Sequence, residues 1–133
     1  MAVGFTIARG DEWQNTSLED SGGFPHDGLQ QYLLHYFTVD GEAVDPYDGA
    51  SFSGAQLDVL VSQLERAVSE VSPQPLDWPF TKPELVASFH ESCRIYGIEH
   101  LAPRDHALKT LNRAIELAHR ARQRNESLEF IGD

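Results

Sequence analysis

The sequence predicts one mainly helical α+β domain, in which about four helices pack with a small sheet formed by strands at the two ends of the chain. Apolar residues recur at helical spacing in four stretches, and they alternate with other residues near both termini. The chain has 133 residues, of which 41% are hydrophobic and 23% charged, an ordinary globular composition. A chain of this length buries roughly two-thirds of its unfolded surface, so we expect residues 1–133 to form a single domain.

The first predicted element is a strand at the amino terminus. Val3, Phe5 and Ile7 alternate with small or polar residues, and Gly10 follows. Residues 11–28 are polar, rich in glycine and without a period, which predicts a long loop.

A first helix is predicted next, with Asp27 as its capping residue. Its apolar stripe follows the spacing i, i+3, i+4, i+7 and i+8, through Leu29, Tyr32, Leu33, Tyr36 and Phe37. A strand over residues 32–39 is the alternative, because aromatic residues favour sheets. Residues 40–50 contain Asp-Gly twice, which predicts a second acidic loop or a hairpin-like excursion.

The second predicted helix has the clearest signals of the chain. Ser53 and Gln56 have the spacing of a capping box, and one apolar stripe continues to about Ser72. Three prolines then predict an extended connector over residues 73–80, anchored on the core by three apolar side chains: Leu76, Trp78 and Phe80.

The third predicted helix begins at Thr81, where the hydroxyl can cap the helix, Glu84 can reciprocate and Pro83 suits the first turn. Gly97 ends it. Its expected inner face consists of five residues: Leu85, Val86, Phe89, Cys93 and Tyr96.

The last helix is predicted from Asp105, as its cap, to Asn125, and arginines crowd its carboxyl end, where they complement the helix dipole. Alternation over residues 128–131 then predicts a short strand that pairs with the first one.

Charge is distributed very unevenly along this chain. The first sixty residues carry ten carboxylates against Arg9 alone, a formal charge of −9 out of −11 for the whole chain. Such a field repels nucleic acid and anionic lipid and attracts basic proteins, so we expect no nucleic-acid partner. No basic region followed by an apolar run opens the sequence, and no apolar stretch reaches membrane-spanning length, so we expect a cytoplasmic protein that does not bind membranes.

Motifs for catalysis or metal binding are not found in the sequence. The acidic residues between Asp40 and Asp48 lack the EF-hand order, and His90-Glu91 is not followed by a histidine at position 94. Cys93 is the only cysteine, one helical turn from His90, and its apolar neighbours favour a buried, inert thiol over a reactive pair. We therefore expect no catalytic residue, no metal and no cofactor.

Aromatic residues in or beside the two acidic loops suggest a binding surface, because interfaces are enriched in such residues. They are Trp13, Phe24, Tyr47 and Phe52, and each of them could instead anchor its loop on the core. The predicted partner-binding surface combines acidic and aromatic residues: Asp11, Glu12, Trp13, Asp40, Glu42, Asp45, Tyr47, Asp48 and Phe52.

Residues 45–133 resemble small acidic bacterial proteins, some of which look like immunity proteins of polymorphic toxin systems. The resemblance lies in the run Tyr-Asp-Gly-Ala-Ser-Phe-Ser-Gly-Ala-Gln-Leu from Tyr47, the apolar helix, the proline and tryptophan connector, and the ending Leu-Glu-Phe-Ile-Gly-Asp. It implies a cytoplasmic protein that occludes the active site of a partner such as a toxin. It assigns no individual residue.

The sequence therefore predicts a non-enzymatic, immunity- or inhibitor-like protein that binds a basic protein partner through its acidic surface, as a monomer or a homodimer. An alternative is a small enzyme or ligand-binding domain whose pocket between helices gathers His35, His90 or Glu91. A homo-oligomeric structural protein is a third hypothesis.

Overall fold

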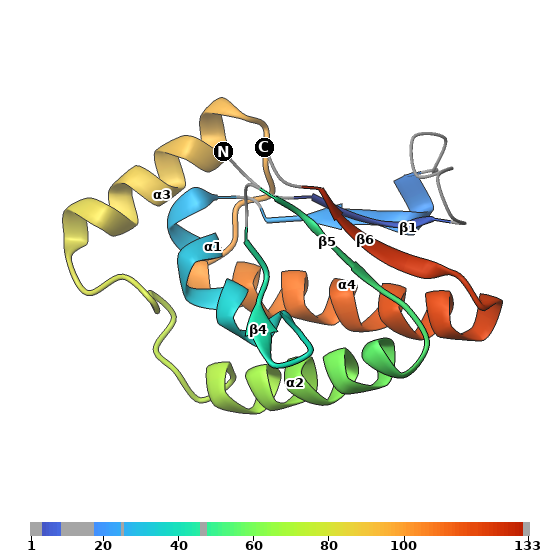
Figure 1. Ribbon diagram of the computed structural model, residues 1–133. Coiled ribbons are helices and arrows are strands. Elements are labelled where there is room, and N and C mark those ends of the chain that lie inside the picture. Colours follow the sequence, from blue (N-terminus) through green and yellow to red (C-terminus); the bar gives the residue numbers. More distant parts are fainter. Residues whose placement is uncertain (1–3, 9–17, 25, 46–47, 132–133) are drawn as a thin grey trace.

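The computed structural model describes residues 4–8, 18–24, 26–45 and 48–131, and Figure 1 shows how they are arranged. It confirms a mainly helical α+β fold with a small antiparallel sheet. The strands are β1 (Gly4–Ala8), β2 (Ser21–Gly23), β3 (Thr38–Val39), β4 (Glu42–Ala43), β5 (Ala50–Phe52) and β6 (Ser127–Ile131). The helices are α1 (Asp27–Leu33), α2 (Ala55–Val71), α3 (Pro83–Ile95) and α4 (Pro103–Arg124), with short 3-10 helices η2 (Leu18–Asp20) and η3 (Leu34–Tyr36).

The main sheet has the strand order β2-β1-β6-β5, and all of its pairs are antiparallel. Phe5 faces Phe130 and Ile7 faces Leu128 across the β1–β6 ladder, which confirms the predicted pairing of the terminal strands. Alternate residues of a strand point to the same face, so these four apolar side chains form one buried surface. The edge strands β2 and β5 lie in segments for which no strand was predicted, because three residues are too few to show a period.

Helix α4 lies between the sheet and α2, and the three layers are visible in Figure 1. Its buried residues include four alanines at or near helical spacing, Ala107, Ala114, Ala118 and Ala121. Small side chains let neighbouring elements approach closely, while Leu111 and Leu117 fill the space beside them.

Five phenylalanines form a cluster between the sheet and the helices: Phe5, Phe24, Phe37, Phe52 and Phe130. The ring of Phe130 is central to the cluster, with centroids 4.8 Å from Phe37, 5.5 Å from Phe5 and 5.9 Å from Phe52. The segments that carry these rings are therefore held together by one aromatic core.

The first predicted helix is shorter than its apolar stripe. The side chain of His26, rather than Asp27, caps α1, because its Nδ1 accepts the Gly28 N–H at 3.0 Å. The chain continues as η3 to Tyr36, and Phe37 leaves the helix to open the β3–β4 hairpin. Helix and strand, the two alternatives for this region, thus each hold for part of it.

Two other helices begin at a proline instead of at the predicted cap. Lys82 occupies the N-cap position of α3 in place of Thr81, and Ala102 that of α4 in place of Asp105. Neither side chain makes a capping hydrogen bond. Proline suits the first helical position because its missing N–H needs no partner there. In α2, Gly54 is the N-cap, and half of the predicted capping box is formed, since the Ser53 N–H donates to Gln56 Oε1 at 3.1 Å.

Helix α3 contacts the first turn of α4, where Phe89 and Cys93 lie against His106. Of its five expected inner residues, only Phe89 and Cys93 are buried, whereas Leu85 is 45% and Tyr96 76% exposed. The connector anchors also differ from expectation: Trp78 and Phe80 pack on the core, and Leu76 is exposed. The predicted inner face was too wide. The part of α3 that packs on its neighbours is the part that carries Phe89 and Cys93, and the Phe89 ring contacts His26, Phe80 and His106.

Candidate functional site

The second acidic segment folds as the β3–β4 hairpin with a two-residue turn. Asp40 and Gly41 form the turn with φ values of 52° and 88°, the left-handed pair that a type I′ turn requires. Of the two forms predicted for this segment, an acidic loop or a hairpin-like excursion, the structure therefore shows the hairpin.

Apolar contacts fix the hairpin on the body of the molecule. Val44 is buried, Val39 packs against the core, and the Val44 N–H donates to the Phe37 carbonyl at 2.9 Å. Asp40, Glu42, Asp45 and Asp48 are all exposed, and we call these four residues the acidic hairpin surface.

Ion pairs with lysines and arginines neutralise carboxylates on other elements. Eight described arginines and lysines lie within 4.0 Å of a carboxylate, and their partners are on other elements: Asp20, Asp58, Glu70, Glu91, Glu99, Asp105 and Glu116. Within the described residues, Asp40, Glu42 and Asp48 make no ion pair with a lysine or arginine. The negative charges of Asp40, Glu42 and Asp48 are therefore not cancelled by the described lysines and arginines.

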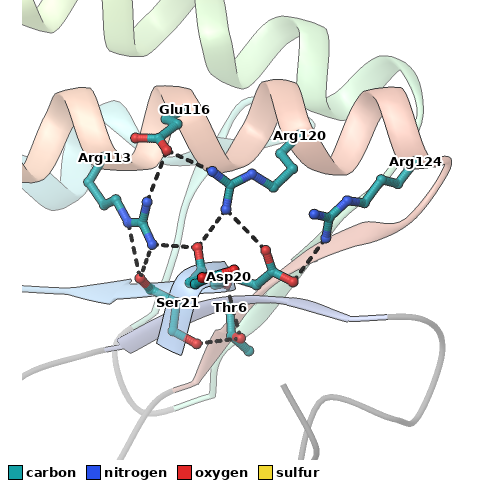
Figure 2. Close-up of polar contacts among 8 residues, drawn as sticks. Thr6, Asp20, Ser21, Arg113, Glu116, Arg120 and Arg124 are labelled. Atoms are coloured by element: carbon teal, nitrogen blue, oxygen red, sulfur yellow. Dashed lines mark hydrogen bonds and ion pairs between the residues drawn. The ribbon is translucent and has the colours of Figure 1, made fainter. Parts of the chain in front are cut away.

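Asp20 shows the opposite situation, since the end of α4 neutralises it (Figure 2). Arg120 reaches Asp20 Oδ1 at 3.0 Å and Arg124 reaches Oδ2 at 2.9 Å. Burial raises the pKa of Asp20, but hydrogen bonds and charge from Arg124 and Arg120 outweigh it, so the pKa lies below its usual value. Asp58 is likewise paired with Arg122 at 3.2 Å. Two of the ten early carboxylates thus belong to the structure's own ion pairs.

Arg113 extends this arrangement toward β2. Its guanidinium donates to the Ser21 carbonyl from Nε at 3.1 Å and from Nη2 at 3.0 Å, while Glu116 accepts from both Arg113 and Arg120. The result, visible in Figure 2, is a row of α4 arginines that holds the η2–β2 segment. Sequence reasoning explained these arginines by the helix dipole alone and missed their partners, which lie about a hundred positions away.

The aromatic part of the predicted surface needs one correction. Phe52 is fully buried and packs on Phe130, so it serves as an anchor of β5 and not as a contact for a partner. Phe24 is buried in the same cluster. Asp11, Glu12, Trp13 and Tyr47 lie outside the described residues.

The histidines and Glu91 of the alternative hypothesis do not converge. His35 is exposed with its ring against Tyr36, Glu91 is exposed and paired with Arg94, and His90 lines a cavity of about 350 Å³ beside α3. Neither of the other two lines that cavity, and a larger one of about 640 Å³ along α4 is lined by none of the three.

Cys93 is buried as expected, and burial raises the pKa of its thiol. His106 lies beside its sulfur, with Nε2 4.0 Å from Sγ and 2.8 Å from the Glu99 carbonyl oxygen. Burial lowers the pKa of His106, although the Glu99 carbonyl partly offsets it. Burial thus favours the uncharged form of both groups, the thiol over the thiolate that would be the nucleophile.

Two searches of the described residues bear on other classes of function. No group of three or more histidine, cysteine, aspartate or glutamate side chains there is arranged to hold a metal ion. None of the described helices combines the length and the apolar character needed to cross a membrane. No protein-family model, curated protein or solved structure matches this chain.

Proposed function

We propose that this chain is a non-enzymatic, immunity- or inhibitor-like protein of the cytoplasm that binds a basic protein partner through its acidic hairpin surface. The observation that carries the proposal is the separation of charge. Eight of the nine described lysines and arginines pair with carboxylates on other elements, whereas Asp40, Glu42 and Asp48 are exposed and pair with none of them. A fixed cluster of like charge steers an oppositely charged partner and sets its orientation.

The way the hairpin is anchored supports this role. Val39 and Val44 hold it on the core, so binding would not require the carboxylates to be ordered first. Charge sets approach and orientation more than affinity, so apolar contacts must supply part of the binding energy. Trp13 and Tyr47 remain the proposed aromatic contacts, with Asp11 and Glu12 beside Trp13 in the sequence.

A capture experiment with charge variants tests the proposal. The hairpin variant Asp40→Asn, Glu42→Gln, Asp48→Asn removes three negative charges, and asparagine still suits the left-handed turn position. The control variant Glu65→Gln, Asp77→Asn, Glu84→Gln removes the same charge from exposed residues on α2, the connector and α3. These residues also make no ion pair with any lysine or arginine that the structure describes. Each immobilised protein is incubated with lysate of the native host at low salt, and bound proteins are identified by mass spectrometry.

We expect the wild type and the control variant to capture a basic protein. The hairpin variant should recover roughly tenfold less of it, which corresponds to a loss of about 1.4 kcal/mol of binding free energy. Capture of the same protein in equal amounts by all three, or capture only of acidic proteins, would contradict the proposal. Circular dichroism of the variants confirms that each is folded.

A further inference from the structure

A groove of about 640 Å³ runs along α4, and strand β2 forms its other wall. His106 and Thr110, from successive turns of α4, line it on one side, and Gly22 and Gly23 of β2 line it on the other. The volume lies in the range of sites that hold small molecules.

Hydrogen bonds to two main-chain carbonyls bound the groove at its two ends. The His106 side chain donates from Nε2 to the Glu99 carbonyl at 2.8 Å. Arg113 reaches across from α4 to β2 and donates to the Ser21 carbonyl at 3.0 and 3.1 Å (Figure 2). His106 and Arg113 lie two turns of α4 apart, about 10 Å, so the space between them has a defined length.

Two side chains of the α4 wall are buried without using their full hydrogen-bonding capacity. Thr110 is 6% exposed, and its hydroxyl bonds to no residue that the structure describes. His106 is 3% exposed, and burial lowers its pKa, so the imidazole is neutral at pH 7. Because Nε2 carries the proton that the Glu99 carbonyl accepts, Nδ1 is left as an acceptor, and no described residue donates to it.

These two polar groups are accessible rather than sealed inside the protein. Within the described part of the chain, His90 Nδ1 is the one side-chain nitrogen or oxygen that is both shut off from solvent and without a hydrogen-bond partner. The Thr110 hydroxyl and His106 Nδ1 are therefore within reach of a molecule in the groove that they line. Buried polar groups in proteins are nearly always hydrogen-bonded, so an occupant of the groove, water or a ligand, completes these two.

Charge and shape narrow the class of ligand. The charged side chains that line the described groove pair with one another, Arg113 with Glu116 and Lys109 with Glu99, so the lining favours an uncharged molecule. The β2 wall has no side chain at Gly22, where a Cβ would lie 2.6 Å from Phe5 Cε2. A flat molecule can therefore lie against the bare backbone of this wall.

We propose that this groove binds a small, planar, uncharged molecule that carries a lactam, the cyclic amide edge of many heterocycles. The lactam N–H would donate to His106 Nδ1, and the adjacent carbonyl would accept from the Thr110 hydroxyl. The ring would lie between α4 and the glycines of β2, with Ile98 beside it. The site shares no residue with the acidic hairpin surface, so its test is independent of the proposed function.

A titration with 2-quinolinone, followed by the amide resonances of the 15N-labelled protein, tests the inference. This probe is a planar, uncharged lactam, and N-methyl-2-quinolinone is the same molecule without the N–H donor. We expect 2-quinolinone to shift resonances of β2 and of the first half of α4 with a Kd on the order of 1 mM, which suits a probe of this size. The N-methyl compound should bind at least about fivefold more weakly, because it cannot donate to His106 Nδ1.

The variant Thr110→Val removes the hydroxyl and keeps the shape of the side chain, and Thr38→Val makes the same change on β3 as a control. We expect Thr110→Val to bind 2-quinolinone about fivefold more weakly than the wild type and the control do. Its melting temperature should not fall, because the hydroxyl that it removes has no partner in the described protein.

Four results would each overturn the inference. They are an absence of shifts with 2-quinolinone, which would leave water as the occupant of the groove, equal affinity for the N-methyl compound, equal affinity of Thr110→Val and the wild type, and a clearly lower melting temperature of Thr110→Val than of the wild type.

Discussion

Replacing Phe130 by alanine is expected to lower the free energy of unfolding by about 4 kcal/mol, the usual loss for a buried phenylalanine. The ring contacts four other phenylalanines from four different segments, and its residue is only 3% exposed. Because those segments are fixed by the backbone, they cannot all move inward to fill the cavity. Urea denaturation followed by circular dichroism measures the loss.

The neighbouring residue provides the control. Ile131 lies on the same strand but is 37% exposed, so Ile131→Ala should cost less than about 1 kcal/mol. A loss below about 1.5 kcal/mol for Phe130→Ala, or equal losses for both variants, would show that the aromatic cluster does not hold the sheet on the helices.

Asp20→Asn is expected to lower the free energy of unfolding by about 2 kcal/mol at pH 7, within the range for hydrogen bonds to charged groups. Its carboxylate is 19% exposed and is held by Arg120 and Arg124, so the pairs are less screened than ordinary surface ion pairs. The substitution keeps the size of the side chain and removes its charge. We expect the exposed Asp48→Asn, measured in the same way, to cost less than about 0.5 kcal/mol.

The pH dependence of this difference gives a second test. The folded protein holds the pKa of Asp20 below its ordinary value of 3.8, so the folded state favours the carboxylate. The contribution is fully present above pH 3.8, and it is lost as the pH falls below 3.8 through the folded pKa. The difference in free energy of unfolding between the wild type and Asp20→Asn should therefore become smaller as the pH falls through that range. A gap that stays constant with pH would mean that the charge of Asp20 contributes nothing.

Local patterns predicted the terminal strands and the body of each helix well, because those elements bury one continuous stripe. The apolar stripe of α2 and the alternate positions of Phe5 and Ile7 in β1 can be recognised from the sequence alone, without knowing which elements they pack against. The predicted starts of α3 and α4 were less accurate. In each case a proline that suits the first helical position lies two residues from a side chain that could cap the helix, at Pro83 and at Pro103. The direction from which the preceding chain reaches the helix decides between the two starts.

Long-range contacts decided what the sequence did not reveal. Phe52 lies in a segment rich in turn signals, and only its place beside Phe130 makes it a core residue. Asp20 and Glu42 both lie in acidic segments of the sequence. Arginines some hundred positions away neutralise Asp20, whereas none of the described lysines and arginines pairs with Glu42. The location of the acidic hairpin surface was predicted from composition, whereas its isolation from the cations depends on the fold.

The salt dependence of association tests the binding proposal most directly. The association rate constant of the captured partner is measured by stopped flow from about 20 to 500 mM salt, across the range in which screening removes the attraction of exposed charges. For the wild type and the Glu65, Asp77, Glu84 control variant, we expect the association rate constant to fall at least tenfold across that range. For the hairpin variant, we expect a smaller rate constant at low salt and a fall of about threefold or less. A rate for the wild type that does not change with salt, or equal slopes for the two variants, would contradict steering by the acidic hairpin surface.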